Sequence, residues 1–188
     1  MPKLNEMNEK LAKLYKLKLA VMMSDSDIRR WLGDGDYIIK YSELASYESL
    51  RDLLPEDKGF KIILTEDHVN TGHWTCLLRY GKTVEWFDSI GVKPDGELRY
   101  IPNPIRACLG EKVKHLSRLL NSSPWKVIYN KKKFQSLTKG VNTCGRWVIG
   151  RIVMMKLGYT LEDFQDFIDH ETAETGKPSD ILIVDLIT

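Results

Sequence analysis

Cysteine is scarce in this chain, and its scarcity excludes several kinds of protein. The 188 residues include three cysteines, Cys76, Cys108 and Cys144, and no two of them form a CxxC pair. An odd number without such pairing argues against a disulfide scaffold and for a reducing compartment. The four histidines show no ligand-like spacing to the cysteines, so we expect no zinc and no other bound metal.

Long hydrophobic runs and a strong charge of one sign are also missing. No apolar run approaches the ~18 residues of a membrane span, and the Lys- and Glu-rich N-terminus has no apolar signal core. We therefore expect neither membrane insertion nor secretion. The net charge is only +2, whereas nucleic-acid binders usually have a stronger basic bias. Basic patches permit a weak nucleic-acid contact, and Lys131-Lys132-Lys133 is either a solvated loop or an anion-contacting patch.

The remaining composition is that of an ordinary globular protein, with 43% hydrophobic and 29% charged residues. The length predicts one domain over residues 1–188 with a sizeable core. The fold class is α+β, because helical and strand patterns are interspersed. We expect helices at 4–20, 42–54, 104–120, 144–157 and 161–173, strands at 37–40, 60–64, 73–80, 83–88 and 125–129, and a terminal strand or docked tail at 181–186.

The N-terminal segment has an amphipathic pattern. Leu4, Met7, Leu11 and Leu14 are three and four residues apart, with Lys and Glu between them. Such a stripe is normally buried, so we expect residues 1–22 to form a helix packed on the core. A second helix should begin after Ser24, whose side chain can cap free backbone N–H groups.

Cys144 lies where an irregular polar segment gives way to an apolar run. Asn142 or Thr143 can cap the following helix, which places Cys144 in its first turn. There, free N–H groups and the helix dipole stabilise a thiolate and lower its pKa. Gly145 has no side chain, so a substrate backbone can approach the sulfur. By itself, the stretch also fits a small structural cysteine at the start of a buried helix.

His73 and Asp88 lie in two predicted strands joined by a tight turn. If Tyr80 faces Thr83 across the hairpin, Asp88 pairs with Thr75, and His73 shares a face with it two residues away. An acid bonded to one imidazole nitrogen fixes the tautomer and stabilises an imidazolium beside a thiolate. A one-residue change in register would separate the two side chains, and an ordinary ion pair is the alternative.

Two further residues fit the same chemistry. Gln135, nine residues before Cys144, can donate its amide to the oxyanion that forms when sulfur attacks a carbonyl. Trp74 follows His73 and points to the opposite face of the strand, where an aromatic ring can roof a narrow slot. Each is also common in other settings, as a loop glutamine and a core tryptophan.

Taken in order, these motifs resemble a family of cysteine proteases. Gly72-His73-Trp74, Trp86-Phe87-Asp88-Ser89-Ile90-Gly91, Gln135 and Thr143-Cys144-Gly145 are similar to the pattern shared by the adenovirus maturation protease (adenain) and the SUMO-deconjugating enzymes. Fifteen residues separate the histidine from the acid, as in the family, whereas the interval from glutamine to cysteine is a little longer than usual. The resemblance covers about residues 60–157, the expected catalytic core. The Asn-Thr-Cys-Gly-Arg-Trp-Val context is most similar to adenain-like proteases of virophages, polinton-like elements and large DNA viruses.

The resemblance implies a papain-like fold in which helices pack a central mixed sheet and the nucleophile begins a buried helix. It implies Cys144 as nucleophile, His73 as general base and Asp88 as the acid that orients it. Gln135 and the backbone N–H of Cys144 would form the oxyanion hole. Trp74 and Gly145 would line the slot for the substrate.

The implied activity is a cysteine endopeptidase that hydrolyses viral capsid or scaffold precursors after small residues such as Gly, through a thioester. We expect a monomer acting in the virion and in the host cytoplasm or nucleus. One alternative is a protease that deconjugates or processes ubiquitin-like modifiers, and another is a catalytically silent binding module. No cofactor is required by the sequence. Adenain is activated by a peptide and by DNA, but no motif in this chain supports either kind of activation. Cys108 has no evident role.

Overall fold

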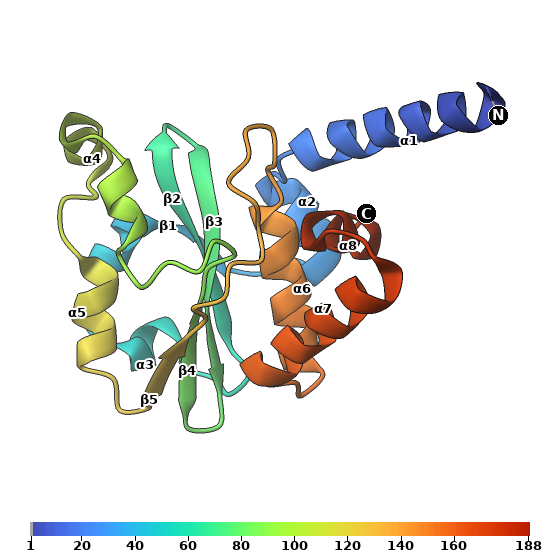
Figure 1. The fold of residues 1–188 in the computed structure, drawn as a ribbon. Coiled ribbons are helices and arrows are strands. Elements are labelled where there is room, and N and C mark those ends of the chain that lie inside the picture. Colours follow the sequence, from blue (N-terminus) through green and yellow to red (C-terminus); the bar gives the residue numbers. More distant parts are fainter. Residues whose placement is uncertain (1) are drawn as a thin grey trace.

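A five-stranded mixed sheet runs through the middle of the molecule (Figure 1). The computed structural model describes residues 2–188, and side chains from residue 7 onward; the side chain of Leu4 is outside the described part. β2, β3 and β4 form an antiparallel meander, while β1 and β5 pair in parallel at the two edges. The strands are β1 Ile38–Lys40, β2 Phe60–His68, β3 Thr71–Tyr80, β4 Thr83–Phe87 and β5 Lys126–Tyr129.

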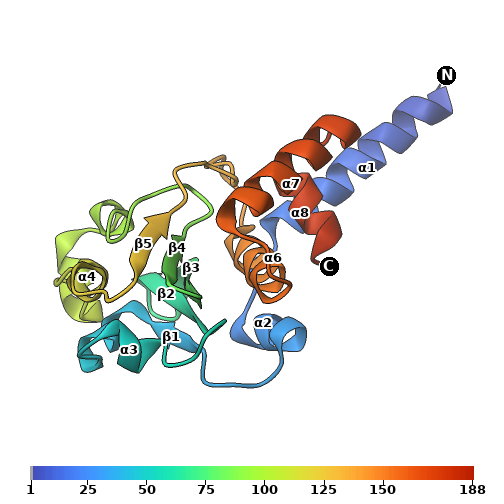
Figure 2. The same cartoon turned by 90° about the horizontal axis from the view of Figure 1, so that it is seen from below.

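Helices cover both faces of the sheet, and Figures 1 and 2 show the two helical layers from perpendicular directions. One layer holds α3, α4 and α5, and the other holds α2, α6, α7 and α8. The helices are α1 Pro2–Ala20, α2 Asp25–Leu32, α3 Leu50–Leu53, α4 Asn103–Leu109, α5 His115–Asn121, α6 Cys144–Lys156, α7 Leu161–Thr175 and α8 Ser179–Leu186, with short 3-10 helices η1 Tyr41–Ser46 and η2 Glu97–Tyr100. None of the helices within residues 2–188 has both the length and the apolar character needed to cross a membrane.

Alternation along the strands divides the buried side chains into two cores. Ile62, Trp74 and Cys76 face the layer of α6, whereas Ile63 and Leu77 face the layer of α5. Successive residues of a strand point to opposite faces, so this division follows from the strand periodicity alone. The expected α+β fold, a mixed sheet packed by helices, is confirmed.

α6 is the buried helix that the apolar run after Cys144 predicted. Its charged residue Arg151 is nevertheless fully buried and meets Glu85 of β4 through two hydrogen bonds of 2.8 Å. A buried guanidinium requires such a partner because desolvation of an unpaired charge is costly. The pair ties α6 to the sheet, and the sequence pattern did not predict it.

Several predicted boundaries differ from the structure. The 104–120 segment is two helices, α4 and α5, because the backbone turns at Gly110, which has a left-handed conformation (φ 76°). The 42–54 segment is the 3-10 helix η1 followed by the single turn of α3. Residues 181–186 belong to the helix α8, so the strand alternative was wrong there, whereas a docked terminal segment agrees with the structure. The Ile- and Val-rich run is buried against α6 and α7, where no strand edge is available to it.

α1 projects away from the body of the molecule (Figure 1). Its second half contacts α8, where the Tyr15 hydroxyl donates to Asp185 at 3.1 Å. Met7, Leu11 and Leu14 remain 59%, 49% and 48% exposed. The expected packing of residues 1–22 on the core is therefore confined to the last turns of the helix, and the described part of the chain leaves the apolar stripe uncovered.

Candidate active site

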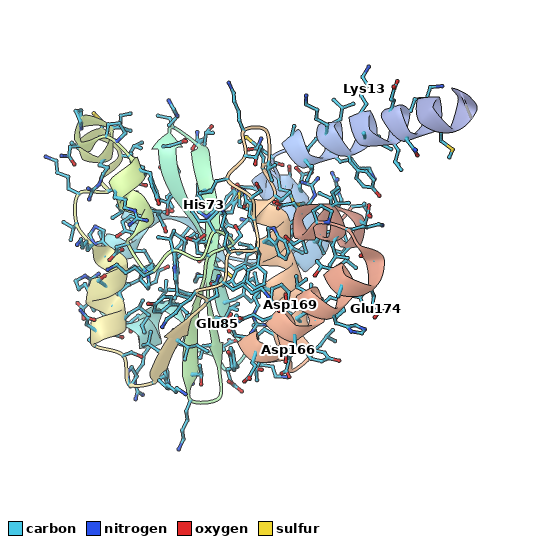
Figure 3. The ribbon with its side chains drawn as sticks, viewed as in Figure 1. Lys13, His73, Glu85, Asp166, Asp169 and Glu174 are labelled. Atoms are coloured by element: carbon cyan, nitrogen blue, oxygen red, sulfur yellow. The ribbon has the colours of Figure 1, made fainter. Side chains whose placement is uncertain are left out.

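The site lies where β3 extends beyond its neighbour β4. Pairing between the two strands stops at Cys76 and Phe87, so the first half of β3 has no partner on that side. Tyr80 faces Thr83, as the sequence predicted. The chain turns away from the sheet at Asp88, and α6 begins at Cys144 beside the unpaired part of β3. His73 projects from this part of the sheet, between the helical layers (Figure 3).

His73 and Asp88 are in direct contact. The ring Nε2 of His73 lies 2.7 Å from Oδ1 of Asp88, and the backbone N–H of Ile90 donates to the same oxygen at 2.9 Å. The Asp88 side chain is fully buried, whereas that of His73 is 21% exposed. The bond to Asp88 occupies Nε2, so Nδ1 is the ring nitrogen left for another partner.

Cys144 lies close enough to His73 for each to affect the titration of the other. Burial lowers the pKa of His73, but hydrogen bonds to Asp88 and to Cys144 outweigh it and hold the pKa well above its ordinary value. Burial raises the pKa of the Cys144 thiol, but the hydrogen bond and the charge of His73 outweigh this and lower it. The backbone N–H groups of Trp74 and Gly145 act in the same direction. The arrangement therefore favours a thiolate beside an imidazolium.

The start of α6 is held differently from the prediction. Cys144 is indeed in the first turn, but neither Asn142 nor Thr143 caps it through its side chain. The Thr143 hydroxyl donates instead to Asp180 of α8, which also accepts from the Trp147 indole at 3.2 Å and from the Ser136 backbone N–H at 2.7 Å. Asp180 was missed because its segment did not look helical.

Gln135 is held by hydrogen bonds to a residue next to Asp88 and to a residue shortly before Cys144. Its Oε1 accepts from the Ser89 hydroxyl at 2.7 Å, and its Nε2 donates to the carbonyl of Val141 at 3.2 Å. Ser89 follows Asp88, and Val141 lies three residues before Cys144. An amide nitrogen carries two hydrogens, so one remains after the bond to Val141.

The turn that carries Asp88 is held by hydrogen bonds to residues far from it in the sequence. Asn130 accepts from the Asp88 backbone N–H at 2.9 Å and donates to its carbonyl at 2.6 Å. The Ser89 carbonyl accepts from the backbone N–H groups of Phe134 and Gln135. The segment after β5 thus holds the acid and the glutamine in one unit, and no pattern in the sequence indicated the role of Asn130.

Trp74 and Gly145 are packed against residues of the chain itself. The Trp74 indole N–H donates to the Met23 carbonyl at 2.9 Å, and Trp74 is only 6% exposed. A Cβ atom on Gly145 would lie 2.9 Å from Cβ of Met23 and 3.4 Å from Trp74. Gly145 therefore makes room for Met23 and Trp74, and the approach of a substrate backbone is not what requires a glycine there.

Met23 belongs to a segment, residues 19–23, that runs past the start of α6. The carbonyls of Leu19 and Ala20 accept from Asn142, and that of Val21 accepts from Arg146. We call residues 19–23 the strap. A cleft of about 620 Å³ lies beside the strap and Trp74, and it is lined by parts of residues 22–26, 38–43 and 70–72. Backbone carbonyls carry no side-chain signal, so the sequence did not reveal the strap.

A second buried acid, Glu97, lies near the His–Asp pair. Its Oε1 accepts from the Thr65 hydroxyl at 2.8 Å, and Thr65 is paired with His73 across β2 and β3. Its other oxygen, like Oδ2 of Asp88, has no hydrogen-bond partner among the described residues. Burial, followed by the charge of Asp88, raises the pKa of Glu97 to about 7.

Other predicted features lie outside this site. Cys76 is buried in the core and Cys108 is exposed on α4, and neither forms a disulfide. Lys132 pairs with Asp169 of α7, and its neighbours Lys131 and Lys133 are exposed. Within residues 2–188, no cluster of three or more His, Cys, Asp or Glu is arranged to hold a metal ion.

Comparison with known proteins identifies a viral relative. The chain is 35% identical over 150 residues to the uncharacterized protein V9 of Sputnik virophage, covering 79% of this chain and 84% of V9. No protein-family model matches. The central domain of the uncharacterized protein Lpg1148 from Legionella pneumophila aligns with 76% of this chain and 81% of its own, at 15% identity and a TM-score of 0.36, too low to identify a fold. The virophage relative agrees with the virophage part of the resemblance, and its name states no activity.

Proposed function

The chain belongs to the family of the Sputnik virophage protein V9, and we propose that it is a papain-like cysteine peptidase. The observation that carries the proposal is the interaction of Cys144 with His73, whose other ring nitrogen binds the buried Asp88. A cysteine with a purely structural role does not need a histidine beside it. A histidine without a catalytic role does not need a buried carboxylate on its other ring nitrogen. The three together are the groups that covalent catalysis by a thiol requires.

The chemistry follows from these positions. The Cys144 thiolate attacks the carbonyl carbon of the scissile peptide, and the oxyanion accepts from the Cys144 backbone N–H and the Gln135 amide. His73 gives its proton to the departing amine as the C–N bond breaks, leaving a thioester on Cys144. His73 then takes a proton from water, whose oxygen attacks the thioester and releases the carboxylic acid and the thiolate. Asp88 keeps the imidazole oriented throughout.

The substrate we propose is a capsid or scaffold precursor, cleaved after a small residue such as Gly during virion assembly in the host cell. Support for a small residue comes from the close packing of Trp74, Gly145 and Met23 at the start of α6, next to Cys144. Support for the viral context comes from the virophage relative.

The test is to co-express the protein with the candidate capsid protein and to map the capsid termini by mass spectrometry. New termini should form with the wild type and with Cys108→Ala, which removes an exposed cysteine of α4, and should be absent with Cys144→Ala. Cleavage that persists with Cys144→Ala would rule out the proposed nucleophile. Covalent capture by C-terminal probes of ubiquitin-like proteins, in place of precursor cleavage, would favour a deconjugating enzyme.

A further inference from the structure

A cleft on the opposite helical layer from α6 has a marked excess of positive charge. It has a volume of about 550 Å³ and lies between η2, α5 and β5. Four cationic side chains line it, namely Lys93, Arg99, Arg106 and Lys114. None of them forms a salt bridge with a carboxylate among the described side chains. We call this the basic cleft.

The acids closest to the basic cleft are turned into the protein. Asp95 is 6% exposed, and its two carboxylate oxygens accept from the Tyr41 hydroxyl and the Ser117 backbone N–H. Glu111 is fully buried and accepts from the Glu66 backbone N–H. The outward-facing charge is therefore positive, and like charges held together in this way favour an anionic partner.

The floor and the rim indicate what kind of anion fits. Leu98, Leu120 and Val127 line the cleft with apolar surface on which polypeptide side chains can pack, beside one aromatic ring, that of Tyr129. β5 is the outermost strand of the sheet, and no described strand pairs with its other side. Its free N–H and C=O groups can bind an extended chain by adding a strand.

We propose that the basic cleft is an exosite that binds an acidic, extended segment of the polypeptide substrate. This inference rests on the proposed peptidase function and names a property of its substrate, namely acidic residues away from the scissile bond. The connection to the active site is short. Lys93 is five residues after Asp88, so their Cα atoms are at most about 18 Å apart. An extended segment of about six residues spans that distance.

The experiment measures binding by the full chain carrying Cys144→Ala, so that no catalysis is needed. The probe is a fluorescein-labelled peptide of alternating Glu and Val, and its match has Gln in place of every Glu. We expect the acidic peptide to bind, the Gln peptide to bind roughly tenfold more weakly, and added salt to weaken only the acidic one. Fluorescence anisotropy reports all three.

Charge reversal tests the location. Lys93→Glu with Lys114→Glu should weaken binding of the acidic peptide roughly tenfold or more. The matched control is Lys10→Glu with Lys13→Glu on α1, which changes the net charge equally at exposed positions and should leave binding unchanged. Thermal unfolding of both pairs confirms that they fold.

Three results would overturn the exosite: equal binding of the two peptides, equal weakening by the two reversed pairs, or tighter binding of single-stranded oligothymidine than of the acidic peptide at the same salt. None of these three results bears on the peptidase proposal, which depends on the reactivity of Cys144. Conversely, loss of the peptidase proposal would leave a measured acidic-peptide site intact.

Discussion

Replacing Glu97 with glutamine should make the stability of the fold less sensitive to a rise in pH from about 4.5 to about 7. Glu97 is 4% exposed, and only one of its carboxylate oxygens has a partner among the described residues, the Thr65 hydroxyl. Burial and then the charge of Asp88 disfavour its ionised form, while the charge of His73 acts the other way. Asp95 adds a further negative charge nearby. Glutamine has nearly the same shape and no proton to lose.

The magnitude follows from the pKa. A displacement from 4.5 to about 7 corresponds to roughly 3 kcal/mol between the protonated and ionised states. The folded pKa is raised, so the stability associated with the proton on Glu97 is fully present below the unfolded value of 4.5. It is lost as the pH rises through about 7. The wild type should therefore lose up to roughly 3 kcal/mol across this range through Glu97, and Glu97→Gln should keep it.

Urea denaturation at a series of pH values from about 4.5 to just above 7 measures the effect, as the difference between the two proteins in how the unfolding free energy changes with pH. The control is Glu48→Gln, an exposed glutamate whose replacement should leave the wild-type pH dependence intact. Equal loss of stability in wild type and Glu97→Gln over this pH range would refute the assignment of Glu97 as a buried acid with a raised pKa.

Three further predictions concern the site and the helix that carries it. The rate at which iodoacetamide alkylates Cys144 should rise at a pH well below the free-thiol pKa of about 8.5, and in His73→Ala the rise should return to that value. Equal pH profiles of the two proteins would contradict the ion pair. Gly145→Ala should lower the unfolding free energy by about 1–3 kcal/mol, because the added Cβ would clash with Met23, even though alanine favours a helix more than glycine does. A raised melting temperature would disprove this. Arg151→Met should lower the unfolding free energy by about 3–5 kcal/mol, because the buried Glu85 loses its ion-pair partner. Adding Glu85→Gln should recover part of this loss in urea denaturation. Additive effects of the two substitutions would show that the pair is not coupled.

The hairpin and the α6 helix could be predicted because their signals are local. Two strands separated by two residues allow few registers, and the tightest turn pairs Tyr80 with Thr83, as in the structure. The register then places His73 and Asp88 on the same face with no further information. The long apolar run after Cys144 similarly has no alternative to a buried helix. Local periodicity is sufficient to predict a feature that depends on a single hairpin or a single helix.

The rest of the site depends on contacts that leave no trace in a residue pattern. The strap acts through its backbone carbonyls, and Asn130 clamps the Asp88 backbone from 42 residues away. α8 was misassigned because Ile and Val have strand propensities, whereas packing against α6 and α7 decides its conformation. Such residues can be recognised only after the tertiary fold is known.

The unusual interval between Gln135 and Cys144 has a structural answer. The spacing along the chain matters only if the glutamine is positioned by its own connection to the cysteine. Here Gln135 is positioned at both ends of its amide, by Ser89 on one side and by the Val141 carbonyl on the other. Extra residues can be accommodated in the exposed segment between Ser136 and Gly140 without moving either anchor. The longer interval is therefore compatible with the proposed role of Gln135.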